Sequence, residues 1–267
     1  LIELLDFLRI PSISTQPAHR ADMTAAAQWL RDHFSSAGFS RAEVMATTGH
    51  PVVYAEWLAA GPSAPTVLVY GHYDVQPPDP LDAWHSPPFE PQIRGGDLFA
   101  RGASDDKGQA YVHVKAAESY GRTRGSPPVN IKCLIEGEEE MGSPSFAPFV
   151  RDHHDLLAAD VALISDTHIL GADQPSIVYA LRGLAYLELT VTGPAHDLHS
   201  GIYGGAVNNP LNALCRIIAQ LQDATGRVTI PGFYDRVRDL SPDERRELAK
   251  IPFDRDAWLE EAGVTMD

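Results

Sequence analysis

A histidine and a carboxylate follow directly on an apolar run in the first third of the chain. The run Thr66–Tyr70 is rich in apolar and β-branched residues, and it ends at Gly71-His72-Tyr73-Asp74. This pattern predicts a buried strand with His72 and Asp74 at its carboxyl end. Open α/β sheets place their chemistry at that edge. Taken alone, the pair indicates either a local hydrogen-bonded turn or a metal site.

Acidic residues recur at three later positions of the same kind. Asp105 and Asp106 stand side by side before a predicted helix, where they either cap the helix or share a cation that offsets their repulsion. The run Glu138-Glu139-Glu140 follows the predicted strand 129–135, and a solvated helical face does not explain three glutamates there. Asp166 follows a further short apolar strand.

Together these loops offer one imidazole and three carboxylates, from His72, Asp105, Glu140 and Asp166. Mixed nitrogen and oxygen ligands suit zinc, and they also suit manganese or cobalt. The sequence therefore predicts a divalent metal site built on converging loops.

The elements that would position these residues alternate between strand and helix through about the first 170 residues. Apolar runs predict strands at 52–58, 66–70, 129–135 and 161–165, and helical periodicity predicts helices at 22–37, 108–120 and 146–153. This alternation predicts a three-layer α/β domain.

The pattern changes near Gln174-Pro175, where we place a domain boundary between residues 1–174 and 175–267. Residues 176–192 carry strand signals, with Gly183 at a bend. An amphipathic helix is predicted to begin at Asn209-Pro210, and the capping box Ser241-Pro242-Asp243-Glu244 predicts another.

Composition excludes several classes of partner. A net charge of −15 argues against nucleic acid and against anionic membrane surfaces, because both require a cationic face. The sequence has no apolar run near the roughly 20 residues of a membrane span. The two cysteines, Cys133 and Cys215, are too few for a disulfide scaffold, so we expect free, buried thiols and a cytoplasmic location.

Five motifs occur in an order that resembles the carnosinase and carboxypeptidase G superfamily of dinuclear zinc metallopeptidases, which also contains succinyl-diaminopimelate desuccinylase and acetylornithine deacetylase. The motifs are Gly71-His72-Tyr73-Asp74, Gly102-Ala103-Ser104-Asp105-Asp106-Lys107-Gly108, Glu136-Gly137-Glu138-Glu139-Glu140-Met141-Gly142-Ser143, Ser165-Asp166 and Asp197-Leu198-His199-Ser200-Gly201. The second and fifth are most similar to the dipeptidase branch.

This resemblance implies a fold and a set of metal ligands. Residues 1–174 would form a zinc-peptidase-like catalytic domain with a mixed sheet, and residues 175–267 would form an α+β, ferredoxin-like lid and dimerisation domain. His72 and Asp166 would bind one metal ion. Glu140 would bind the other, and Asp105 would bridge the two ions and be followed by a cis peptide bond.

Three catalytic roles are also implied by the resemblance. Asp74 would orient the His72 ring, and Glu139 would act as the general base. His199 would reach the active site of the partner subunit in a homodimer formed through the lid, where it would stabilise the oxyanion.

The expected activity is hydrolysis of the peptide bond of dipeptides or small peptides through a metal-bridged water. Two alternatives stay open: an N-acyl-amino-acid amidohydrolase, such as a deacylase or desuccinylase, and a catalytically silent fragment that serves as a dimerisation module. Members of the superfamily continue past this length and supply a last histidine ligand. We therefore expect the lid and the second metal site to be incomplete in these 267 residues, which by themselves would hold at most one tightly bound ion and show little activity.

Overall fold

The computed structural model describes residues 1–171 and 174–264. Residues 172–173 and 265–267, which fall inside the two predicted domains, lie outside the described residues. The chain separates into two compact units, residues 1–181 and 182–267. The predicted boundary between residues 174 and 175 falls near this division.

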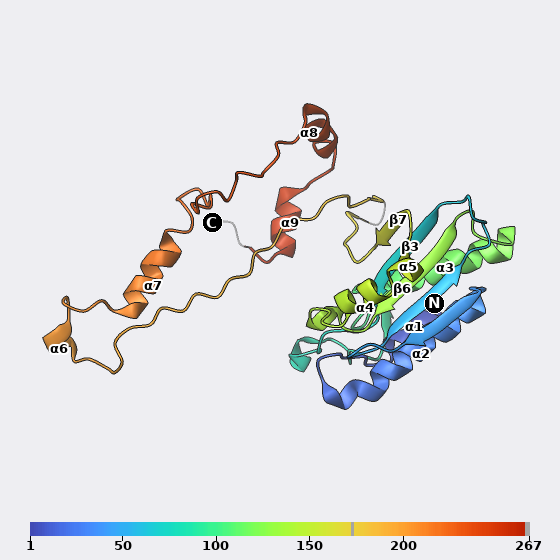
Figure 1. The fold of residues 1–267 in the computed structure, drawn as a ribbon, viewed down its shortest axis with the longest axis horizontal. Coiled ribbons are helices and arrows are strands. Elements are labelled where there is room, and N and C mark those ends of the chain that lie inside the picture. The colour runs from blue at the N-terminus through green and yellow to red at the C-terminus, as the bar shows by residue number, and fades with distance from the viewer. Residues whose placement is uncertain (172–173, 265–267) are drawn as a thin grey trace. The chain divides into compact units, whose positions relative to one another are not determined.

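The first unit is built on a five-stranded mixed sheet (Figure 1). In spatial order its strands are β1 (Arg41–Met45), β2 (Val52–Trp57), β6 (Asn130–Glu136), β3 (Thr66–His72) and β7 (Val161–Ile164). Strand β3 runs parallel to both β6 and β7, whereas β2 is antiparallel to both β1 and β6. The carboxyl ends of β3, β6 and β7 therefore meet at one edge of the sheet.

Helices cover both faces of this sheet. They are α1 (Ile2–Leu8), α2 (Arg20–Ala37) and α3 (Lys107–Arg124) on one face, and α4 (Phe146–Asp152) and α5 (His154–Leu157) on the other. Successive side chains of a strand point to opposite faces. Accordingly Val53 packs in the core with α2, while Tyr54 packs with Phe149 of α4. The predicted three-layer α/β arrangement with a mixed sheet is confirmed.

A local signal sets the end of helix α2. Helix α2 ends at Gly38, whose φ of 105° is left-handed and suits a residue without a Cβ. A short hairpin, β4 (Gln92–Arg94) and β5 (Asp97–Phe99), lies outside the predicted elements. Three 3-10 helices complete the unit, at Pro17–His19, Leu81–Ala83 and Glu139–Met141.

The second unit contains four helices among its described residues: α6 (Ser200–Tyr203), α7 (Pro210–Ala219), α8 (Pro242–Leu248) and α9 (Arg255–Glu261). The side chain of Asn209 caps α7 and that of Ser241 caps α8, so both predicted helix starts are confirmed.

The strands predicted at 176–192 are not present, and that prediction is wrong. Apolar side chains there gave the strand signal, but a strand also needs a hydrogen-bonded neighbour. No strand occurs among residues 182–264 to provide one.

Both cysteines are free, but only Cys133 is buried. Cys215 on α7 is exposed, which corrects the prediction of two buried thiols. Within the described part of the chain, no helix is both long and apolar enough to cross a membrane.

Candidate metal centre

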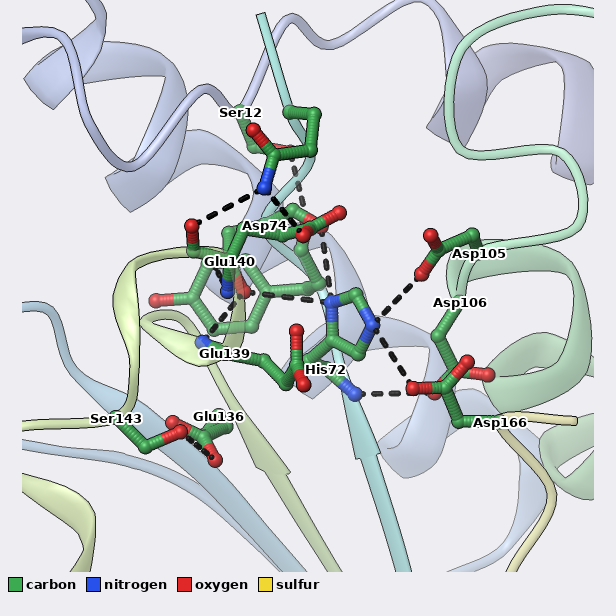
Figure 2. A network of polar contacts seen from close by, with 12 residues as sticks. Ser12, His72, Asp74, Asp105, Asp106, Glu136, Glu139, Glu140, Ser143 and Asp166 are labelled. Atoms are coloured by element: carbon green, nitrogen blue, oxygen red, sulfur yellow. Dashed lines mark hydrogen bonds and ion pairs between the residues drawn. The ribbon is translucent and has the colours of Figure 1, made fainter. Parts of the chain in front are cut away.

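Three predicted metal ligands come together at the edge where β3, β6 and β7 end. His72 is the last residue of β3, is fully buried and lies opposite Glu136 at the end of β6. Asp166 follows β7, and Asp105 comes from the loop before α3. Figure 2 shows the His72 ring between Asp74 on one side and the carboxylates of Asp105 and Asp166 on the other.

The spacing of these three residues fits a bound metal ion. The Nε2 atom of His72 lies 3.1 Å from Asp105 Oδ1 and 3.5 Å from Asp166 Oδ2. One ligand atom from each of the three residues lies within 4.8 Å of the others. Ligands at about 2.0–2.2 Å from a tetrahedral ion are roughly 3.3–3.6 Å apart. The two distances from the imidazole are close to that range.

The charges around His72 also favour a cation. Burial lowers the pKa of the His72 imidazole, but contact with Asp74 and the charges of Asp74, Asp106 and Asp166 outweigh burial and raise that pKa to about 10. The carboxylates therefore stabilise positive charge at this point, which a divalent ion would supply. The peptide bond between Asp105 and Asp106 is cis, as the resemblance implies.

Asp74 contacts both the histidine and the acidic turn. The Nδ1 atom of His72 lies 3.0 Å from the main-chain oxygen of Asp74 and 3.4 Å from its Oδ1. When Nδ1 donates this bond in a neutral ring, Nε2 is left as the ligand atom. The Asp74 carboxylate, which is fully buried, accepts the backbone N–H groups of Glu139 at 3.2 Å and Glu140 at 3.1 Å. This second role was not predicted.

Asp74→Asn should weaken zinc binding by the roughly 10–100-fold that loss of an outer partner of a metal ligand costs. The new side-chain NH2 group would oppose a backbone N–H and displace the acidic turn. Competition with a chromophoric chelator measures the affinity. Asp82→Asn, a change at an exposed residue, is the control and should bind zinc normally. An affinity within twofold of the parent protein would contradict the role of Asp74.

Glu139 and Glu140 lie on the 3-10 helix that follows β6. Burial raises the pKa of Glu139, the charge of His72 lowers it, and the charges of Asp166, Asp74 and Asp105 raise it further. Glu139 thus shares the electrostatic environment of the three grouped ligands.

Glu140, the fourth predicted ligand, is not part of the three-residue group. Its Oε2 accepts a hydrogen bond from Gln76 Nε2 at 2.7 Å. Burial also raises the pKa of Glu140, and the Gln76 bond opposes that rise.

Asp106 and Lys107, which follow Asp105, make contacts that were not predicted. Asp106 Oδ2 accepts the backbone N–H of His72 at 3.0 Å, and burial raises the pKa of Asp106 to about 7. The buried Lys107 Nζ donates to the main-chain oxygen of Ile10 at 2.7 Å, and burial lowers the pKa of Lys107 to about 7. The only signal in the sequence was their position directly after Asp105. Sequence order alone does not show which of these residues lies beside the other proposed ligands.

His199 belongs to the second unit. It is the N-terminal cap of α6, and its Nδ1 accepts the backbone N–H of Gly201 at 3.0 Å. Its predicted catalytic role stays a prediction.

Comparison with known proteins finds metallodipeptidases and dipeptidases among the relatives of this chain. The chain is 34% identical over 247 residues to the Cys-Gly metallodipeptidase dug1 of Schizosaccharomyces pombe, and the match covers 88% of this chain and 52% of that protein. It is 34% identical over 216 residues to the human Beta-Ala-His dipeptidase, covering 80% of this chain and 42% of that protein. The chain therefore spans about half the length of the curated relatives it matches.

A solved structure is similar over almost the whole chain. It is an M20 family metallo-carboxypeptidase, Sso-CP2 from Sulfolobus solfataricus, with a TM-score of 0.83 and 36% identity over 99% of this chain and 59% of that one. The predicted resemblance to the dipeptidase branch of the superfamily is confirmed. The model for peptidase family M20/M25/M40 matches residues 68–260, and the chain belongs to that family.

Proposed function

We propose that the protein is a metal-dependent hydrolase that cleaves the peptide bond of dipeptides or small peptides. The observation that carries this proposal is the grouping of His72, Asp105 and Asp166 at ligand spacing, with Glu139 in the same electrostatic environment. The similarity to a Cys-Gly metallodipeptidase and to a Beta-Ala-His dipeptidase supports a dipeptide substrate.

In this proposal His72 and Asp166 would hold one ion, Glu140 would hold a second, and Asp105 would contribute to both. Zinc suits this mixture of nitrogen and oxygen ligands, with manganese or cobalt as alternatives. When bound, such ions lower the pKa of water and polarise a carbonyl group.

Glu139 would move the proton. Its carboxylate would accept a proton from the attacking water and return it to the nitrogen of the leaving amine.

Residues 175–267 would act as lid and dimer interface, with His199 contributing to the partner's active site. Apolar side chains exposed on α7, such as Leu211 and Ile218, support an interface. A cytoplasmic location is supported by the two free cysteines.

The test is a substrate screen with the intact protein. Zinc-loaded protein is offered Cys-Gly, β-Ala-His, N-acetyl amino acids and N-succinyl amino acids, with and without a chelator. We expect hydrolysis of dipeptides that the chelator abolishes and added zinc restores. Cleavage of N-acyl amino acids alone would replace the proposal by an amidohydrolase, and chelator-resistant turnover would overturn metal dependence.

A further inference from the structure

Glu138, the first residue of the three consecutive glutamates, accepts hydrogen bonds from two backbone amides. Glu138 is buried, with 4% of its surface exposed. Its Oε1 accepts the N–H of His50 at 2.9 Å, and its Oε2 accepts the N–H of Ser145 at 3.0 Å. One carboxylate thus joins the loop between β1 and β2 to the start of α4. We call this arrangement the Glu138 latch.

The loop between β1 and β2 is shaped around this carboxylate. A Cβ atom on Gly49 would lie 1.7 Å from Glu138 Oε1, so only glycine fits beside it. The hydroxyl groups of Thr48 and Ser145 are 2.8 Å apart, and this hydrogen bond also joins the loop to the start of α4. His50 Nε2 lies 3.0 Å from the main-chain oxygen of Ser14, so His50 is held through both its backbone and its ring.

The main chain of Glu138 controls the turn that follows it. Its carbonyl oxygen accepts the N–H groups of Met141 at 3.1 Å and Ser143 at 2.8 Å. Glu139 and Glu140 lie between Glu138 and Met141, so the backbone position of both depends on Glu138.

Two other buried carboxylates hold the same turn. Asp74 accepts the amides of Glu139 and Glu140, as described above. Glu136 Oε1 accepts the hydroxyl groups of Tyr70 at 2.7 Å and Ser143 at 2.9 Å, and Figure 2 shows the contact with Ser143. The Glu138 latch is the third support, and it connects the turn to the loop between β1 and β2.

We propose that Glu138 is a positioning residue for the hydrolysis, and this proposal rests on the proposed function. It sets the place of the Glu139 carboxylate through the main chain, without contact with substrate. Three consecutive glutamates then have three separate tasks: Glu138 fixes the turn, Glu139 moves the proton, and Glu140 binds metal. A glutamine cannot replace Glu138, because its NH2 group would oppose a backbone N–H.

Two variants test the proposal by different chemistry. Glu138→Gln removes an acceptor, and Gly49→Ala forces the carboxylate aside without changing any charge. Each should lower kcat per bound zinc by roughly 10–100-fold, the range for outer partners of a metal site. KM should stay within about twofold, because the misplaced Glu139 acts in the transition state only. Glu90→Gln is the control, since this residue is exposed and lies outside the site.

A second measurement does not depend on activity. Hydrogen exchange of the His50 and Ser145 amides should quicken in both variants, because their shared acceptor is lost or moved. The double variant should lose no more kcat than the stronger single variant, because both changes act on one contact. If Glu138→Gln does not fold, the kcat and the hydrogen exchange of Gly49→Ala decide whether Glu138 is a positioning residue.

The outcomes separate this proposal from the proposed function. Unchanged kcat per folded molecule, or unchanged exchange at both amides, would overturn the positioning role. An unmodified protein that hydrolyses no peptide would instead contradict the proposed function, and the exchange measurement would still decide whether the latch exists.

Discussion

Glu139→Gln should lower kcat by about 10²–10⁴-fold while zinc content stays that of the parent protein. Glutamine has nearly the same shape, but it cannot accept the proton of water and return it to the leaving amine. Glu139 is not one of the three grouped ligand residues, so the substitution removes a base and leaves the metal contacts in place. Turnover of the dipeptide found in the screen and zinc analysis of the same sample give the two measurements.

Two comparisons make this experiment decisive. Glu90→Gln changes an exposed glutamate outside the site and should leave both measurements unchanged. Glu140→Gln should lose zinc, because its carboxylate is proposed as a ligand. If Glu139→Gln and Glu140→Gln lost zinc equally and kept residual turnover, the assignments of base and ligand would be wrong.

His72→Ala should have the largest effect on metal binding. His72 supplies the only nitrogen in the three-residue group, its residue is fully buried, and both ring nitrogens have polar neighbours. Without the imidazole, only Asp105 and Asp166 of this group are left to bind a cation. The loss of zinc affinity should exceed the 10–100-fold expected for Asp74→Asn, and peptidase activity should disappear with the metal.

Zinc content after dialysis, together with calorimetric titration, measures this loss. His85→Ala is the matched control, because His85 is an exposed histidine on the same unit. Retention of one tightly held ion by His72→Ala would mean that a different set of residues forms the first metal site.

The position of the site could be predicted because it depends on where apolar runs end. Thr66–Tyr70 predicted a buried strand, and the structure places His72 at the end of that strand. The parallel pairing of β3 with β6 and β7 then brings the following loops to one edge. These are local patterns combined with a general property of α/β sheets, and a single sequence contains both.

The parts that could not be predicted depend on partners distant in sequence. The apolar signal of residues 176–192 contains no information on whether a neighbouring strand exists. The amphipathic pattern of α7 likewise cannot show whether another element covers Cys215, which the structure leaves exposed. The carboxylate of Asp74 accepts amides 65 and 66 positions away, a contact that only the assembled sheet produces.

The parallel pairing of β3 with β6 also constrains the order in which the molecule forms. A parallel pair needs a long crossover, here through α3, so the chain must close a large loop before the pair gains any contact. Such non-local pairing is slow. His72, Asp105 and Asp166 come together only after it, and the unfolded chain offers no comparable binding site. Zinc would then act by mass action on the folded chain alone, adding about 2.7 kcal/mol of stability at a hundredfold excess over its Kd. The supply of metal would then affect the stability of the folded protein as well as its activity.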